Sequence, residues 1–156
     1  MALDATDFGY VSMLRDEPSP GDSTYVKVGG YCVTGLATSA MTPGNVVIVD
    51  TATAGSYKTT TSANATTIAG FVVAGLGTTG ASMQWDFVST IASGQRILIL
   101  VKGVVSAFAS TAISIGARVG TSTTAGAVVT TTTQDASRGL ALEAATTAGD
   151  RIRVLV

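Results

Sequence analysis

The first half of the chain resembles the second half, and this self-similarity constrains the fold more than any other feature of the sequence. Residues 33–47 can be laid over residues 105–119 with small residues in register, as at Ala37 and Ala109. The same block also places Gly44 on Gly116. After small length differences the match continues with 54–55 on 125–126, 70–73 on 139–142 and Gly80 on Gly149. Finally, Met83, Trp85 and Phe87 fall on Ile152, Val154 and Val156. We interpret the chain as two degenerate copies of a unit of about 70 residues.

From residue 25 onward the sequence is typical of β-structure. Val, Ile and Thr dominate, and Gly-containing turn signals recur at short spacing. Apolar and polar residues alternate over 83–87 and 151–154, which predicts strands with one buried face. Nearly continuous apolar runs predict strands that are covered on both sides, and these runs are 46–49, 70–74 and 97–101. We therefore expect an all-β fold.

Two segments have a second interpretation, and two threonine runs indicate where they lie in the fold. Residues 140–145 have helical propensity, but the matching stretch 71–74 favours strand, so we expect a strand. The Gly-Leu-Gly-Thr-Thr-Gly segment 75–80 resembles a phosphate loop, yet a strand-like run follows it, which favours a hairpin. The threonine runs 59–61 and 130–133 suit a sheet edge or a hydrated interface better than a dry core.

The first 24 residues differ from the rest of the chain. They are richer in charge, contain Pro18-Ser19-Pro20-Gly21 as a hinge or turn, and include a few large apolar side chains. A frayed terminus and a docking arm are both compatible with this composition. We divide the chain into an extended N-terminal arm, 1–24, and a single β domain, 25–156, with repeat-like halves of about 25–90 and 97–156.

Composition excludes several kinds of partner. Charged residues make up 12% of the 156 residues and the net charge is −1, so there is no electrostatic footprint for nucleic acid or an anionic membrane. The longest aliphatic run, 97–101, is too short to cross a bilayer, and we expect a protein made in the cytoplasm. The single cysteine, Cys32, cannot form an intramolecular disulfide. So few charges on a surface favour association, which predicts that much of the surface is covered.

The sequence offers little catalytic chemistry. It has no histidine, which removes Ser-His-Asp and Cys-His nucleophiles and His-ligated metals. The carboxylates of the β region have ordinary positions at strand ends and turns; Asp150, for example, follows Gly149 in a turn before the last strand. We therefore expect no enzyme, no cofactor and no small-molecule substrate.

The second half carries a combination of motifs seen in one family. These are Gly-x-Val followed by small residues, Ile115-Gly116-Ala117-Arg118-Val119, a Thr/Ala-Gly segment, Gly139-Leu140-Ala141-Leu142-Glu143-Ala144-Ala145, and Ala148-Gly149-Asp150-Arg151-Ile152-Arg153-Val154. Together they resemble the capsid decoration proteins of tailed bacteriophages, also called cement or head-stabilisation proteins. The resemblance covers about residues 25–156 and is strongest from Gly103 onward. It implies a compact β-barrel or β-sandwich-like domain of the β-tulip type, a homotrimer, and no catalysis.

The leading hypothesis is accordingly a structural virion protein. It would bind the outer surface of the mature phage capsid as a trimer and stabilise it by bridging major capsid subunits. The residues expected to make capsid or subunit contacts are Phe8, Tyr10, Met13 and Leu14 in the arm, with Tyr25 and Tyr31 as possible interface residues.

The alternative is a phage fibre or adhesin-type β domain that binds glycans through an exposed aromatic residue such as Trp85. Trp85 alternates with Met83 and Phe87, and we therefore expect it to pack in the core.

Overall fold

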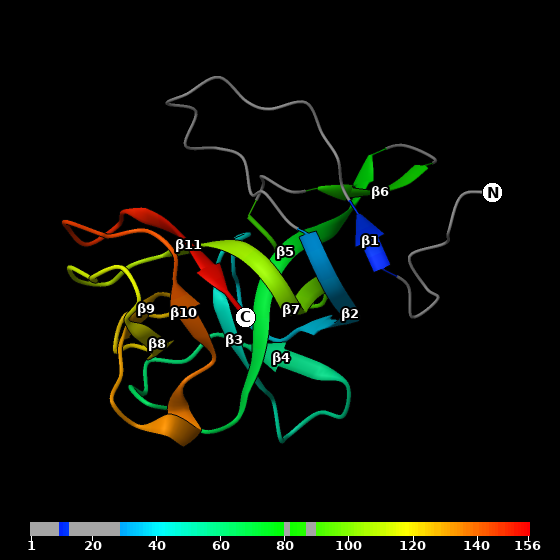
Figure 1. The fold of residues 1–156 in the computed structure, drawn as a ribbon. Coiled ribbons are helices and arrows are strands. Elements are labelled where there is room, and N and C mark those ends of the chain that lie inside the picture. Colours follow the sequence, from blue (N-terminus) through cyan, green and yellow to red (C-terminus); the bar gives the residue numbers. More distant parts are fainter. Residues whose placement is uncertain (1–9, 13–28, 80–81, 87–89) are drawn as a thin grey trace.

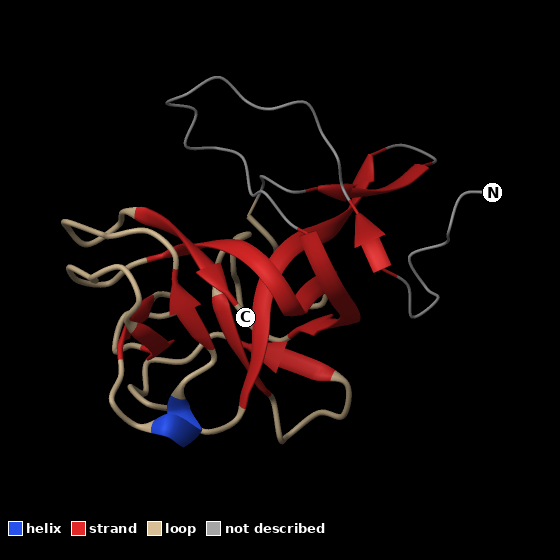
Figure 2. Ribbon diagram, viewed as in Figure 1, coloured by secondary structure: helices blue, strands red, loops and turns tan. Residues whose placement is uncertain are grey.

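The computed structural model describes residues 10–12, 29–79, 82–86 and 90–156. Within these residues the fold is all-β, as predicted, and the helical content is a single 3-10 turn, η1 (Gln134–Ala136), drawn in blue in Figure 2. The described strands form one hydrogen-bonded sheet. They are β1 (Tyr10–Ser12), β2 (Gly29–Ala37), β3 (Val46–Val49), β4 (Ser56–Lys58), β5 (Ile68–Thr79), β6 (Ser82–Asp86), β7 (Arg96–Phe108), β8 (Arg118–Thr121), β9 (Val128–Thr130), β10 (Gly139–Ala141) and β11 (Arg151–Leu155).

Strands of the first half close into a ring. β2 pairs with β4, β4 with β3, β3 with β5, and β5 with β7, and a further β2–β7 ladder completes the circuit. The β2–β4 pair is parallel and the other four pairs are antiparallel. We call this circuit, with residues 96–100 of β7, the first ring. β6 forms a hairpin with β5 and lies off the circuit, and β1 pairs with the free edge of β2.

Strands of the second half form a similar circuit around the other end of β7. Residues 104–108 of β7 pair with β11, and the order continues through β10 and β8 to β9. A parallel bridge from Val128 of β9 to Ala109, directly after β7, closes this second ring. Figure 1 shows the first ring on the right of the view and the second on the left, with β7 arching between them. One long strand therefore belongs to both rings.

The ladders of the two rings have the same register. In the first ring Leu36 of β2 lies opposite Arg96, and in the second Phe108 of β7 lies opposite Arg151. The other corresponding pairs are Val46–Phe71 and Arg118–Leu140, Phe71–Leu100 and Leu140–Leu155, and Val49–Tyr57 and Thr121–Val128. The spacing of these pairs is that of the sequence alignment over residues 33–73. The strands of the two rings are thus paired alike.

The end of the sequence alignment differs from the structure. Ala37 exchanges backbone hydrogen bonds with the Gly94–Gln95 turn, and Ala109 exchanges the same two bonds with the Gly149–Asp150 turn. Gly94, and not Gly80, therefore occupies the position of Gly149. The predicted match of 83–87 to the last strand fails because residues 83–86 belong to the β5–β6 hairpin. Because β5 and β6 form this hairpin, the phosphate-loop interpretation of 75–80 is also removed.

Each ring has its own buried interior. Side chains inside the first ring form one cluster, which includes Met41, Val47, Val72 and Ile97. Side chains inside the second ring belong to a larger cluster that also takes in the outer side of the first ring, namely Cys32, Val46, Phe71, Leu98 and Leu100. The outer side of the first ring is therefore covered by the body of the protein.

Polar contacts join the two rings. The carbonyl of Gly126 accepts a hydrogen bond from the Val46 N–H (2.9 Å), and the buried Thr121 hydroxyl bridges the Ser62 carbonyl (2.9 Å) and the Ala65 N–H (2.8 Å). Thr131, 5% exposed, donates to the amide oxygen of Asn64 at 2.8 Å. The expectation that the threonine runs avoid the core is therefore wrong at Thr131, because a side-chain partner satisfies its hydroxyl.

Most local predictions agree with the strands. Residues 70–74 and 97–100 are buried on both faces, and β11 alternates as its sequence predicted. The segment 140–145 is extended only as far as Ala141, where β10 ends. Beyond that point Leu142 donates to the carbonyl of Arg153, and the backbone turns away from the ladder.

Candidate functional site

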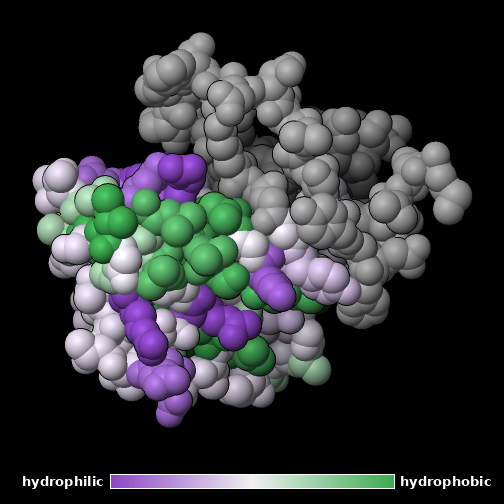
Figure 3. Space-filling view, viewed as in Figure 1, coloured by the Kyte–Doolittle hydropathy of each residue, from purple (hydrophilic) through white to green (hydrophobic). Residues whose placement is uncertain are grey.

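An exposed apolar surface lies on the outer side of the second ring. Leu140 and Leu155 are direct partners across β10 and β11, and Leu155 in turn lies opposite Val104 of β7. Leu155 is 45%, Leu140 38% and Leu142 37% exposed. Figure 3 shows a contiguous hydrophobic area over β7, β10 and β11. We call Val104, Leu140, Leu142 and Leu155 the outer face. Contiguous apolar patches of this kind mark interaction sites.

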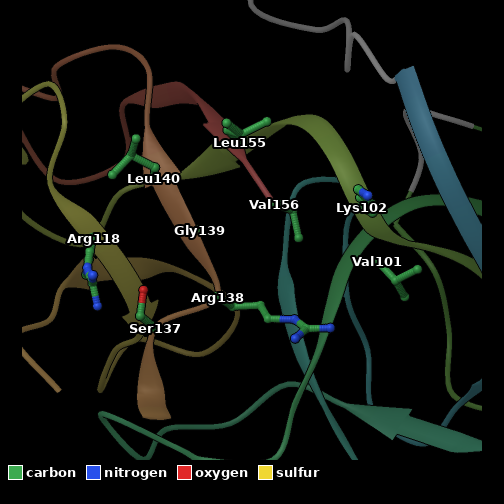
Figure 4. A pocket seen from close by; sticks show the side chains of 9 residues that line it. All are labelled: Val101, Lys102, Arg118, Ser137, Arg138, Gly139, Leu140, Leu155 and Val156. Carbon is green, nitrogen blue, oxygen red and sulfur yellow. The ribbon is translucent and has the colours of Figure 1, made fainter. Parts of the chain in front are cut away.

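A shallow depression of about 670 Å³ adjoins the outer face. Leu140, Leu155 and Val156 line its apolar part, and Lys102, Arg118, Ser137 and Arg138 supply its polar rim. In Figure 4 the side chain of Arg138 reaches across below Val156. The residues that line this depression include bases and no acid. The depression is therefore suited to a partner surface that has an apolar centre bordered by neutral or acidic residues.

One ion pair borders the outer face. Glu143 accepts from the Arg153 Nε at 2.7 Å and from the Arg153 backbone N–H at 2.9 Å. Both side chains are well exposed, so the pair contributes less than about 1 kcal/mol to stability. Its main effect is to hold the segment after β10 beside β11, which presents Leu142 next to the other leucines.

A half-buried guanidinium lies where the two rings meet. Arg151 stacks over the ring of Phe108 with its Cζ 4.0 Å from the centroid, and its Nη2 donates to the Pro43 carbonyl at 3.4 Å. Burial lowers the pKa of Arg151 from its ordinary value. The group is part of the junction between the rings and does not face the depression.

The single cysteine is chemically quiet. Cys32 lies in the core cluster, and burial raises the pKa of its thiol to about 11. Since the thiolate is the reactive form, Cys32 is nearly all thiol at neutral pH.

The contact residues predicted from the sequence fall mostly outside the described part. Phe8, Met13, Leu14 and Tyr25 lie outside the described residues. Tyr10 begins β1 and is in register with Tyr31 of β2, whose side chain is 42% exposed. Trp85, in β6, packs against the larger core cluster, as its alternation predicted. The sequence did not predict the outer face, because exposed and buried leucines occur in strands with the same pattern of apolar and polar residues.

Two other kinds of site are absent from the described residues. Among them no group of three or more His, Cys, Asp or Glu side chains is arranged to hold a metal ion. The described part of the chain likewise contains no helix that is long and apolar enough to span a membrane.

Comparison with known proteins places these features in a family. A family model described as phage cement protein matches residues 87–156, which contain β7 and all of the second ring. No curated protein matches the chain. Among solved structures, the head fiber gp8.5 N base of bacteriophage phi29 is similar with a TM-score of 0.55 and 14% sequence identity, over 80% of this chain and 92% of that chain. This likeness concerns the fold.

The resemblance seen in the sequence is confirmed by the family match, and the matched residues include the outer face and its basic rim. Residues 87–156 match the family of phage cement proteins, and this match supports a structural, non-enzymatic virion protein of the capsid surface.

Proposed function

We propose that this protein binds the outside of the mature phage capsid as a homotrimer and bridges adjacent major capsid subunits. The observation that carries the proposal is the family match over residues 87–156. The exposed apolar surface and the low overall charge support it, because a surface of this composition favours association. Many weak contacts summed over three subunits would give avidity without a deep pocket.

The N-terminal arm, residues 1–24, is proposed to dock on a neighbouring subunit or on the capsid through Phe8, Tyr10, Met13 and Leu14, with Tyr25 and Tyr31 at the interface. The pairing of β1 with the edge of β2 supports a docking role, since it shows that this segment can extend a sheet. Deletion of residues 1–17 should weaken binding to shells while the circular dichroism spectrum stays that of a β protein. Unchanged shell binding would disprove the arm proposal.

We also propose that the β domain, residues 25–156, arose from two copies of one unit and is a barrel-like fold of the β-tulip type. The equal registers in the two rings support the duplication. In that register residues 96–100 close the first ring, so the boundary between units falls within β7.

The proposed function is tested by mass and by binding to shells. Light scattering of the purified protein should give three times the mass of one 15.6 kDa chain. The protein should then sediment with expanded phage shells, and the decorated shells should resist heat or chelators better than bare ones. A protein that binds neither expanded nor unexpanded shells would contradict the proposal.

A fibre or adhesin-type glycan-binding domain is the second candidate. The fold likeness to the base of a head fiber favours a fibre-related role. By its description, that protein is also part of a phage head. The packing of Trp85 against the core argues against a sugar platform at that residue. Binding to a glycan array that is lost in Trp85→Ala would favour this candidate over the cement function.

A further inference from the structure

We propose that the outer face of the second ring binds the first ring of a second copy of this chain, through Val49 and the turn 51–55. This inference rests on the proposed trimer and assigns the two surfaces that would join its subunits. The two rings correspond residue by residue, so the same surface can be compared in two environments.

Equivalent residues of the two rings differ in exposure. Phe71 and Leu100 of the first ring are both 0% exposed, whereas their counterparts Leu140 and Leu155 are 38% and 45% exposed. Val73, the counterpart of Leu142, is also 0% exposed. The same face is thus covered in the first ring and open in the second. The side chains remain large and apolar in both, which is the composition of a surface that is meant to be buried.

The first-ring face is bordered by a turn of the second ring. The turn 122–126 places Gly126 against Asn45 and Val46, with hydrogen bonds from the Val46 N–H (2.9 Å) and the Asn45 Nδ2 (3.4 Å) to the Gly126 carbonyl. A Cβ at Gly126 would lie only 2.5 Å from the Asn45 side chain, so the contact is close. Beside the turn, Thr121 is completely buried under residues 62–65.

The first ring has the same turn, and there it is open. Both turns have the sequence Thr-Ala-Gly, at 53–55 and 124–126, and their glycines have similar φ values of +71° and +74°. Nothing lies within 4 Å of a Cβ placed on Gly55. Val49, the counterpart of the buried Thr121, is 43% exposed. The chain therefore presents one open turn of the same kind as the turn that borders the covered face.

Each subunit then has one open turn, on its first ring, and one open apolar face, on its second ring. In the second ring the positions of Asn45 and Val46 are taken by Ala117 and Arg118, and Arg118 lies beside Leu140 at the edge of the outer face. A second copy that placed its Gly55 turn against Ala117 and Arg118 would repeat the contact between the rings. Because the two surfaces differ, the contact is heterologous and joins subunits head to tail, as in a closed cyclic trimer.

Two point variants with a matched control test the proposal. Leu155→Glu and Val49→Glu should each reduce the light-scattering mass to that of one 15.6 kDa chain, because each removes one of the two surfaces. Ala92→Glu is the control, since Ala92 is exposed in the turn before β7 and belongs to neither surface; it should keep the mass of the wild type. A mixture of the Leu155→Glu and Val49→Glu proteins should form a heterodimer, because one intact contact remains between them.

A disulfide test checks the geometry directly. Gly55→Cys and Ala117→Cys introduced together should give disulfide-linked oligomers up to the closed trimer under mild oxidation. Gly94→Cys with Ala117→Cys is the control, because Gly94 is also an open turn glycine with positive φ (+88°) and should not form the link. Cys32 is buried and should not interfere.

The outcomes separate this inference from the proposed function. Variants of Leu155 and Val49 that stay trimeric, or a wild type that is monomeric, would overturn the inference. If Leu155→Glu stays trimeric but no longer binds shells, the outer face meets the capsid, and the proposed function survives without the inference. If deletion of residues 1–17 alone opens the outer face to a hydrophobic dye, the arm covers it and the inference is wrong. A trimer that depends on both surfaces but never binds shells would retain the interface and reject the cement role.

Discussion

At the scale of single residues, the carboxylate of Asp150 holds together the turn that leads into β11. It accepts hydrogen bonds from the backbone N–H groups of Thr147 (2.9 Å) and Thr146 (2.8 Å) and from both hydroxyls, each at 3.0 Å. These donors hold the pKa of Asp150 at about 2, below its ordinary 3.8. The turn role predicted for Asp150 from the sequence is therefore confirmed.

The lowered pKa predicts a pH dependence of stability. A carboxyl group whose pKa is lower in the folded state stabilises the fold above its unfolded pKa, and that stabilisation is lost as pH falls through the folded value. Asp150→Asn should therefore be less stable than the wild type at pH 7, and the difference should shrink between about pH 4 and pH 2. Urea midpoints at pH 7, 4 and 2.5 measure it. Asp135→Asn, on an exposed residue, is the control for charge alone, and an equal difference at all three pH values would contradict the prediction.

Thr121 shows that equivalent positions can need different side chains. Its counterpart Val49 is exposed, whereas the buried Thr121 hydroxyl satisfies both Ser62 and Ala65. Thr121→Val copies the first-ring residue but leaves a carbonyl and an N–H without their partner, so we expect a loss of about 1–3 kcal/mol in the free energy of unfolding. The reverse change, Val49→Thr, should alter it by less than about 0.5 kcal/mol. Equal effects in chemical denaturation would contradict this account.

At the scale of elements, the two Thr-Ala-Gly turns permit a matched comparison. Gly126→Ala and Gly55→Ala place a Cβ on backbones with nearly the same positive φ, so each should cost about 1–2 kcal/mol from that conformation. Only at Gly126 would the new Cβ meet Asn45, whose side chain accepts from the Thr42 N–H at 2.8 Å and resists displacement. We therefore expect Gly126→Ala to lower the denaturation midpoint more than Gly55→Ala. A similar loss in both would mean that the junction between the rings is loosely packed.

At the scale of the whole molecule, the proposed contact between subunits should depend little on salt. The outer face is apolar and the turn 51–55 has no charged residue. Raising the salt from 0.1 M to 1 M shortens the screening length from about 10 Å to about 3 Å, which weakens exposed charge pairs and leaves apolar contacts in place. Sedimentation at the two concentrations should give the same mass. Dissociation at 1 M would instead assign the contact to the basic rim around Lys102, Arg118 and Arg138.

Much of the local structure, and the resemblance to phage cement proteins, could be predicted from the sequence alone. Alternation and apolar runs placed β3, β5 and β11, because strand periodicity is a local property. The alignment of 33–73 with 105–142 anticipated the shared register, because small residues mark the same turns in both halves. The family motifs from Gly103 onward indicated a cement protein. Residues 1–24 had no counterpart in the alignment of the two halves, so their role stays a prediction.

Which side of each ring is covered follows from tertiary packing and not from the local sequence. Leu100 and Leu155 are the same residue at equivalent positions of equally paired strands, yet one is 0% and the other 45% exposed. Nothing local distinguishes them, because burial depends on what packs over a strand and not on the strand itself. The tertiary structure also assigned β6 to a hairpin and β7 to both rings, since strand partners are chosen by contacts far apart in the chain. The open face of the second ring, and with it the candidate site, follows from that arrangement.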